Sequence, residues 1–168
     1  NSTNVTIDRC VVRTGDDCFV VKTLGGETGS VTDTVTVNNC YAWASKARAF
    51  GIFGEVNHSI SNVTFQNSTV LCHDATWSNY QIPAIGIFTS ACDDRDALFA
   101  AGVSISNVTF DNIEICRNEA SPINCITSLP IKVHDITFNN VKFASNNKSN
   151  GFPIIFDIYS GNNDMYNI

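Results

Sequence analysis

Two adjacent carboxylates, Asp16 and Asp17, are the residues of this sequence best suited to chemistry. Neighbouring negative charges repel and neither can be buried without a partner, so we expect the pair at a surface. Gly15 precedes them, and because glycine adopts backbone angles that other residues avoid, we expect both side chains to leave a tight turn on the same side. Paired carboxylates in such a position can cleave glycosidic bonds by acid and base catalysis. The alternative interpretation is an acidic turn that precedes a strand.

Five segments that share one pattern must position this turn. Each alternates apolar and polar residues, which is the period of a strand with one buried face. The segments are Asn4–Arg9, Thr34–Asn39, Asn62–Asn67, Asn107–Asn112 and Asp135–Asn140. The predicted inward pairs are Val5/Ile7, Val35/Val37, Val63/Phe65, Val108/Phe110 and Ile136/Phe138. Their leading apolar residues are 30, 28, 45 and 28 residues apart, and Tyr166–Ile168 looks like the start of a sixth copy.

A second set of strands is expected between these segments. Its members are Cys18–Thr23, Phe50–Glu55, Ala84–Thr89, Ile123–Thr127 and Ile154–Tyr159. Unequal repeats of roughly 30 residues with two strands each are typical of stacked coils. The sequence therefore predicts an all-β fold, a right-handed single-stranded parallel β-helix (solenoid) of about five coils. A β-sandwich is the rival, but its antiparallel strands need not repeat a motif in register.

The length of 168 residues suits one domain, so residues 1–168 are predicted to form a single β-helix segment whose pattern continues beyond both ends. The 45-residue interval holds an inserted loop at about residues 72–100. Long loops on such folds often line a groove. In this loop Trp77 and Tyr80 either stack on a sugar ring or form the small core of the loop itself.

Asparagine recurs at one point of the pattern. The residue four positions after the leading apolar residue is Arg9 in the first copy and asparagine in the next four, namely Asn39, Asn67, Asn112 and Asn140. Asparagine accepts the left-handed backbone conformation that ends a strand, and stacked asparagine side chains can hydrogen-bond to one another. These residues are therefore predicted to have a structural role.

Charge and sequence motifs indicate the compartment. The net charge of −6 argues against nucleic acid and anionic membranes as partners, and no apolar run is long enough to span a membrane. Seven N-glycosylation acceptors accompany seven cysteines, which predicts a secreted, extracellular glycoprotein with disulfides and N-linked glycans. The acceptors are Asn1, Asn4, Asn57, Asn62, Asn67, Asn107 and Asn147.

Six of the cysteines are candidates for disulfides. Cys10 and Cys40 occupy the same point of adjacent repeats, Cys72 and Cys92 bracket the insertion, and Cys116 and Cys125 bracket a short loop. Many other pairings are open. Cys18 remains, and it is expected to be an apolar residue of the strand that follows the carboxylates. No cysteine or histidine spacing supports zinc, and we predict no metal and no cofactor.

The motif Asn4-Val5-Thr6-Ile7, followed by the run from Thr14 to Lys22 (TGDDCFVVK), resembles the central segment of the polygalacturonases of glycoside hydrolase family 28. Members of that family are extracellular right-handed parallel β-helices. The resemblance implies that Asp16 is the general acid. It also implies that Asp17, with another Asp from the preceding coil, activates the attacking water, so that the anomeric configuration inverts. That third carboxylate is expected before Asn1, and this segment alone is therefore expected to be inactive.

Two further motifs of the family are missing. Its Gly-His-Gly should follow one coil after the carboxylates, where residues 45–55 read SKARAFGIFGE, and its Arg-Ile-Lys should follow on the next coil, where residues 82–88 read IPAIGIF. Because Arg-Ile-Lys holds the carboxylate of galacturonate in the family, its absence favours a neutral polysaccharide or a lost activity. Lys46, Arg48 and Glu55 are candidates for contacts with the substrate, and the alternative is a solvated pair of Arg48 and Glu55.

The function predicted from these observations is inverting hydrolysis of a glycosidic bond in a polysaccharide, such as that of a cell wall. The alternative is a non-catalytic structural or carbohydrate-binding protein of an extracellular fibre or coat, which could self-associate through the exposed strand edges at the ends of the β-helix. A polysaccharide lyase would need a calcium site and a basic catalyst, and the sequence supports neither.

Overall fold

The structure of this chain is a computed structural model that describes residues 2–23, 30–74, 82–89, 102–118, 122–127, 131–144, 154–158 and 164–168. The described residues form thirteen strands and no helix, so the predicted all-β class is confirmed. None of these residues belongs to a helix long and apolar enough to cross a membrane.

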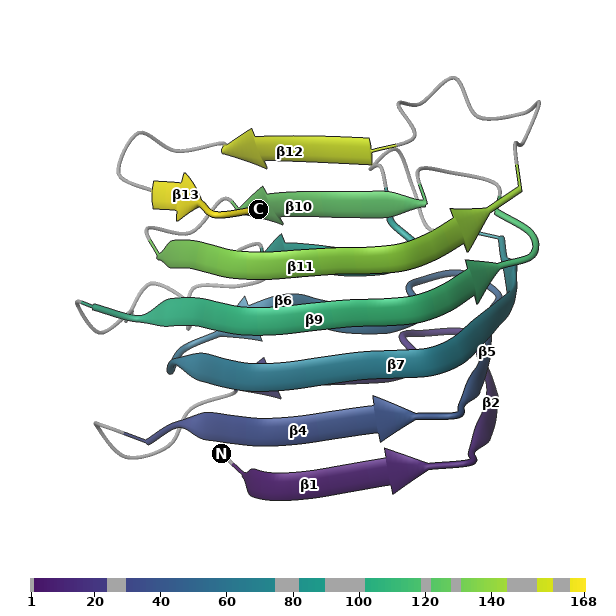
Figure 1. Cartoon of the computed structure of the whole chain (residues 1–168), viewed down its shortest axis with the longest axis horizontal. Coiled ribbons are helices and arrows are strands. Elements are labelled where there is room, and N and C mark those ends of the chain that lie inside the picture. Colours follow the sequence, from purple (N-terminus) through teal and green to yellow (C-terminus); the bar gives the residue numbers. More distant parts are fainter. Residues whose placement is uncertain are drawn as a thin grey trace.

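The strands form two sheets, and every strand pair in them is parallel (Figure 1). The first sheet has the order β1 (Thr3–Asp8), β4 (Thr32–Asn38), β7 (Ile60–His73), β9 (Ser104–Ile115), β11 (Lys132–Phe143) and β13 (Asp164–Tyr166). The short strands β2 (Val11–Thr14) and β5 (Tyr41–Ala44) extend it, since β2 pairs with β5 and β5 pairs with β7.

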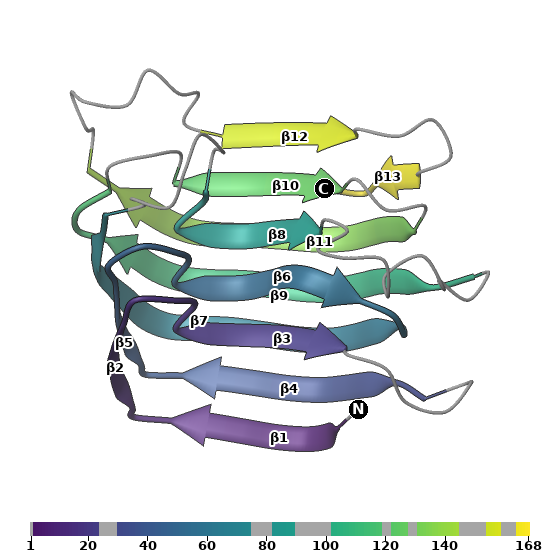
Figure 2. The same cartoon turned by 180° about the vertical axis from the view of Figure 1, so that it is seen from behind.

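The second sheet lies behind the first and contains β3 (Phe19–Thr23), β6 (Phe50–Val56), β8 (Ile85–Thr89), β10 (Ile123–Thr127) and β12 (Ile154–Ile158) (Figure 2). Along the chain, each strand of the second sheet follows one or two strands of the first sheet, and the next strand belongs to the first sheet again. The five segments of the repeated motif lie on β1, β4, β7, β9 and β11 in matching register, for example Val5 beside Val35 and Val63 beside Val108. The motif repeat predicted from the sequence thus corresponds to neighbouring parallel strands.

Sequence reasoning missed a third stretch of strand in each repeat. We predicted two strands per repeat, but β2 and β5 follow the motif directly, and β7, β9 and β11 continue past their asparagines without a break. Alternating residues such as Val11, Arg13, Tyr41 and Trp43 are exposed on this stretch, so its apolar content does not mark a buried face.

Side chains from both sheets fill the space between them, as the alternating pattern predicted. All ten residues of the predicted inward pairs belong to this core or pack against it. Phe65, Phe110 and Phe138 stack in a column at centroid distances of 5.1 and 4.8 Å. Burying one such ring contributes about 1.5–3 kcal/mol relative to exposure, so the repeated phenylalanine is a main source of stability.

Two rows of left-handed residues flank each motif. The predicted row comprises Arg9, Asn39, Asn67, Asn112 and Asn140, with φ between 48° and 54°. Its side-chain amides form a ladder, in which Asn140 donates to Asn112 at 3.0 Å and Asn112 donates to Asn67 at 2.9 Å. A second row consists of the first residue of each segment, together with Asn167 near the end of the chain. Its members are Asn4, Thr34, Asn62, Asn107, Asp135 and Asn167. The structural role predicted for the asparagines is confirmed, because they satisfy one another between strands.

Candidate functional site

Asp16 and Asp17 lie in the short turn between β2 and β3. The backbone N–H of Asp16 donates to Thr14 Oγ1 at 3.0 Å, and the N–H of Asp17 donates to Asp16 Oδ1 at 2.7 Å. These local hydrogen bonds compete with strand pairing and are typical of turns that begin with Thr or Asp. They fix the Asp16 carboxylate relative to the backbone while its side chain stays exposed to solvent.

The predicted role of Gly15 is wrong. Gly15 does not have a left-handed backbone conformation, and a Cβ atom added to it would meet no atom within 4 Å. Nor do the two carboxylates share one environment, because Asp16 is exposed whereas only 5% of the Asp17 side chain is exposed. The turn separates them through the hydrogen bond from Asp17 N–H to Asp16, which needs no glycine.

Two cations surround Asp17. Arg48 lies on the loop between β5 and β6, which is the loop that corresponds to the carboxylate turn in the next repeat. Its backbone N–H donates to Asp17 Oδ1 at 3.2 Å, and its Nη1 lies 3.5 Å from the same oxygen. Lys22 Nζ lies 3.6 Å from Asp17 Oδ2. A carboxylate this shielded needs such partners, because an unpaired buried charge is costly.

The guanidinium of Arg48 also stacks on two aromatic rings. Its Cζ lies 5.2 Å from the ring centre of Phe53 on β6 and 4.8 Å from that of Phe88 on β8. The ring of Phe53 takes the space above Gly51, where a Cβ atom would approach a ring carbon to 2.4 Å. With 14% of its side chain exposed, Arg48 is committed to Asp17 and to these rings, which makes it a positioning residue in this structure.

Glu55 joins the cluster through Lys22, whose Nζ lies 3.3 Å from Glu55 Oε2. An irregularity in the pairing of β3 with β6 brings Glu55 close to Lys22. Between the pairs Val21/Ile52 and Thr23/Val56, β3 has one residue and β6 has three. Gly54 sits within this bulge at φ 80°, and a Cβ atom there would lie 3.3 Å from Lys22 Nζ. The bulge therefore aims Glu55 at the lysine that contacts Asp17.

A buried histidine, His73, lies beside the same loops. His73 ends β7 in register with Ala44, and its Nδ1 is hydrogen-bonded to Asn118 Oδ1. Burial lowers the pKa of His73 to about 4, against the hydrogen bonds to Asn118 and to the backbone of Ala47. The charge of Arg48 lowers it further. No local motif marks His73, since only its place on a strand end brings it here.

The structure brings Asp17, Arg48 and Glu55 together, and Lys46 is exposed on the loop that carries Arg48. Several predicted residues lie outside the described residues, namely Asn1, Trp77, Tyr80, Cys92 and Asn147.

The predicted disulfides between Cys10 and Cys40 and between Cys116 and Cys125 are wrong for this structure, because all four residues carry free thiols. Cys10 and Cys40 are neighbours, as expected, but the sulfur of Cys40 accepts a hydrogen bond from Cys10 N–H at 3.4 Å. Cys116 is exposed after the end of β9, whereas Cys125 is buried within β10. Cys72 is buried, and its Sγ donates a hydrogen bond to Asp74 Oδ1 at 3.1 Å.

Cys18 is half-buried directly before β3, which begins one residue later than predicted. Burial raises the pKa of its thiol to about 12. A thiol with so high a pKa is not a nucleophile at neutral pH, so Cys18 contributes packing rather than chemistry to the carboxylate turn.

Four of the glycosylation acceptors coincide with the left-handed rows, namely Asn4, Asn62, Asn67 and Asn107. The amide nitrogens of three of them already donate within the ladders: Asn62 to Asp33, Asn67 to Asn38 and Asn107 to Asn62. Asparagine accepts the left-handed conformation of these positions, and the following outward strand position favours threonine, so the strand pattern itself generates these motifs. Asn57 is half-buried after β6.

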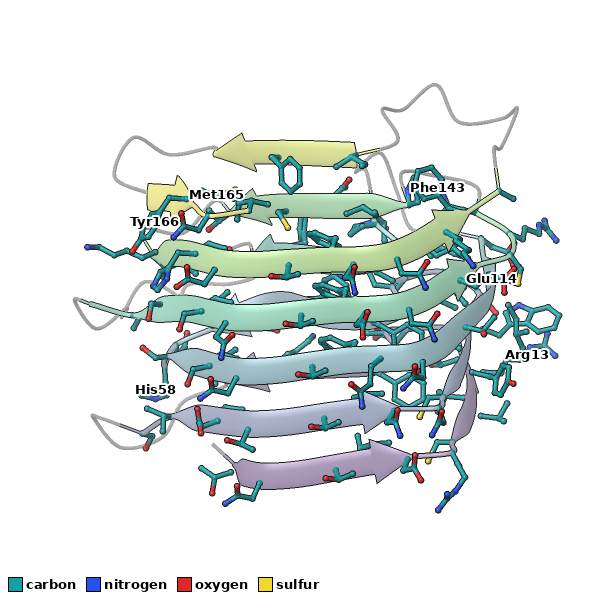
Figure 3. All side chains as sticks on the ribbon, in the orientation of Figure 1. Arg13, His58, Glu114, Phe143, Met165 and Tyr166 are labelled. Carbon is teal, nitrogen blue, oxygen red and sulfur yellow. The ribbon has the colours of Figure 1, made fainter. Side chains whose placement is uncertain are left out.

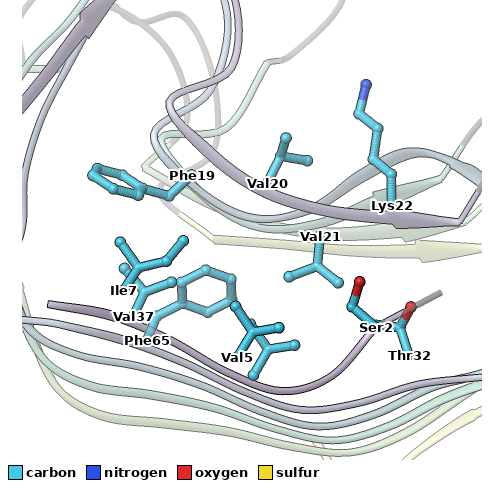
Figure 4. Close-up of a pocket in the computed structure, with 11 residues that line it drawn as sticks. Ser2, Val5, Ile7, Phe19, Val20, Val21, Lys22, Thr32, Val37 and Phe65 are labelled. Atoms are coloured by element: carbon cyan, nitrogen blue, oxygen red, sulfur yellow. The ribbon is translucent and has the colours of Figure 1, made fainter.

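A pocket shares the strand β3 with the site, and Lys22 is among the residues that line it. It has a volume of about 190 Å³ and lies between β3 and the strands β1 and β4. Figure 4 shows Val21 directed into this space, whereas Val20 and Lys22 point away from it on the opposite side of β3. The carboxylate cluster therefore belongs to the outer surface of the second sheet.

Comparison of the chain with protein-family models, with curated proteins and with solved structures finds no match. Among the described residues, no group of three or more His, Cys, Asp and Glu side chains could hold a metal ion.

Proposed function

We propose that this protein is a secreted glycoside hydrolase that resembles family 28 and is built on a right-handed parallel β-helix. Two parallel sheets between which the chain alternates, with the same motif in register on successive strands, support the β-helix. The observation that carries the hydrolase proposal is the contrast between an exposed, hydrogen-bonded Asp16 and a shielded Asp17 held by Arg48 and Lys22. Adjacent carboxylates in different environments can take different roles.

In the proposed reaction Asp16 donates its proton to the glycosidic oxygen while the bond from that oxygen to the anomeric carbon breaks. Its exposure lets it approach a polymer. Asp17 is too shielded to contact a sugar ring directly, so its role is to orient the attacking water and to accept a proton from it. It does so together with a carboxylate that the resemblance assigns to a preceding repeat. Attack from the opposite face of the ring inverts the anomeric configuration.

Arg48 and Lys22 hold Asp17, and Glu55 holds Lys22 from the other side. This assignment makes Arg48 and Glu55 positioning residues, and leaves Lys46, Trp77 and Tyr80 as candidates for contacts with the substrate. The missing Arg-Ile-Lys motif favours a neutral polysaccharide.

The experiment measures reducing ends released from a panel of neutral and acidic polysaccharides by the polypeptide as its source cell produces it. Nuclear magnetic resonance follows the anomeric configuration of the first product. We expect an inverted product with the wild type and loss of release with Asp16→Asn and Asp17→Asn. Asp33→Asn, on β4, is the matched control and should retain activity. A product with retained anomeric configuration, or full activity of Asp16→Asn, would contradict the assigned mechanism.

One observation favours a second candidate, the non-catalytic carbohydrate-binding or structural protein. The cluster of Asp17, Lys22, Arg48 and Glu55 pairs its own charges, as a purely structural network does. In that case Asp17→Asn lowers stability, and no polysaccharide of the panel releases reducing ends with any variant.

A further inference from the structure

A groove crosses the outer surface of β7, β9 and β11 where these strands bend. It has a volume of about 170 Å³. One wall consists of Asn67, Asn112 and Asn140, and the other wall consists of Thr69, Glu114 and Lys142. The floor contains Ser68 and Ile113, which are buried. Thr69 is in register with Glu114, and Glu114 with Lys142, so the groove runs across the strands rather than along them.

The asparagine wall repeats one amide for each strand, at the strand spacing of roughly 4.8 Å. Within the ladder Asn140 donates to Asn112, and Asn112 donates to Asn67. A side-chain amide has two N–H donors and two acceptor lone pairs, so a ladder bond leaves further donor and acceptor capacity on each of these exposed amides. A sugar ring in an extended chain has about the length of this spacing, so successive rings would meet successive amides.

Exposed aromatic residues lie beside the groove on β5, the strand that pairs with β7. Tyr41 is in register with Thr69 and is 46% exposed. Trp43, the next outward residue on β5, is 37% exposed, and Arg13 lies over its ring at 4.7 Å. In Figure 3 Arg13 and Glu114 lie on the same side of the molecule. Exposed Tyr and Trp offer a flat apolar face with a polar edge, which suits stacking on a sugar ring.

The charges of the groove balance, since Glu114 and Lys142 are in register and opposite in sign. The chain as a whole carries −6, which disfavours an acidic polymer. We propose that this groove, together with the exposed rings of Tyr41 and Trp43 beside it, is a binding site for a neutral, extended polysaccharide. The site lies apart from the turn with Asp16 and does not depend on hydrolysis there.

Affinity electrophoresis in gels that contain hydroxyethyl cellulose or neutral xylan tests this site. The protein comes from a host that does not N-glycosylate, because a glycan on Asn67 would occupy the mouth of the groove. We expect both polymers to retard the wild type. Tyr41→Ala should weaken the binding about tenfold, since one stacked ring is lost. The double variant Glu114→Ala with Lys142→Ala should also weaken it.

The matched control is Tyr166→Ala, because Tyr166 is 45% exposed but lies on β13 at the opposite end of the strands (Figure 3). This variant should bind as the wild type does. Asp16→Asn should also bind normally, so a failure of the proposed hydrolysis leaves this result intact. Circular dichroism confirms that each variant is folded. Wild-type protein that neither polymer retards, or equal retardation of the wild type, Tyr41→Ala and the double variant, would overturn the proposal.

Discussion

Protonation of His73 should destabilise the protein as the pH falls. His73 is fully buried in the neutral form, and burial lowers its pKa to about 4 in the folded state. In the unfolded chain its pKa returns to the ordinary value of 6.5. Between these values the unfolded state binds the proton and the folded state does not, so the unfolded state gains free energy there.

The sign and the range of the effect follow from these two values. The contribution of His73 to stability is complete above pH 6.5 and falls as the pH drops from 6.5 towards 4. It reaches a total loss of about 3 kcal/mol, with a slope of up to about 1.4 kcal/mol for each pH unit. Such a loss is a large fraction of the stability of an ordinary domain.

Urea denaturation at several pH values between about 7.5 and about 4.5 measures this loss. The comparison is with His73→Gln, which keeps an amide that can donate to Asn118 but cannot titrate. Carboxylates that titrate in both proteins cancel in the difference. We expect the free energy of unfolding to fall more steeply in the wild type, by a total of about 3 kcal/mol. Parallel curves for the two proteins would refute the assignment of a buried neutral His73.

Substitutions at four positions test the fold. Gly86→Ala should destabilise the protein strongly, because the added Cβ atom would lie 1.9 Å from the carbonyl oxygen of Asn124. Gly15→Ala should change the stability by less than about 0.5 kcal/mol, since no atom lies within 4 Å of its Cβ position. Thermal unfolding of the two variants measures this difference. Asn112→Ala should lower the free energy of unfolding by about 1–2 kcal/mol in urea denaturation, because alanine loses the ladder hydrogen bonds and is strained in the left-handed conformation. Asn112→Gly should recover part of that loss, because glycine adopts this conformation without strain. Phe65→Ala should cost about 3–5 kcal/mol by the same method, because the ring is fully buried, and a cost below about 1 kcal/mol would contradict the packed column.

The repeated motif is the part of the fold that sequence reasoning could predict. A period of two within each segment, and intervals of 28 or 30 residues between most segments, follow directly from parallel strands that share one core; the interval of 45 residues holds the predicted insertion. The strand Ile123–Thr127 was predicted with its exact bounds. The stretch that includes β2 and β5 was missed because Tyr41 and Trp43 are exposed, and their apolar character therefore carries no burial signal.

For the candidate site, the sequence could predict which residues lie near one another but not most of the contacts between them. The run through Asp16 and Asp17 is contiguous, and Arg48 follows one repeat later, so their proximity was expected. The ion pair of Lys22 with Glu55 depends on a bulge in β6, which no local pattern reveals. The stacking of Arg48 on Phe88 joins residues 40 positions apart through strand register.

The role of Asp16 as general acid is tested most directly by comparing two substrates, one whose leaving group requires protonation and one whose leaving group does not. Asp16→Asn is assayed on the polysaccharide that the panel identifies and on a dinitrophenyl glycoside of the same sugar, whose leaving group departs without protonation. We predict a loss of at least about 100-fold on the polysaccharide and a much smaller loss on the dinitrophenyl glycoside. Equal losses on both substrates, or no loss on the polysaccharide, would contradict the role of Asp16.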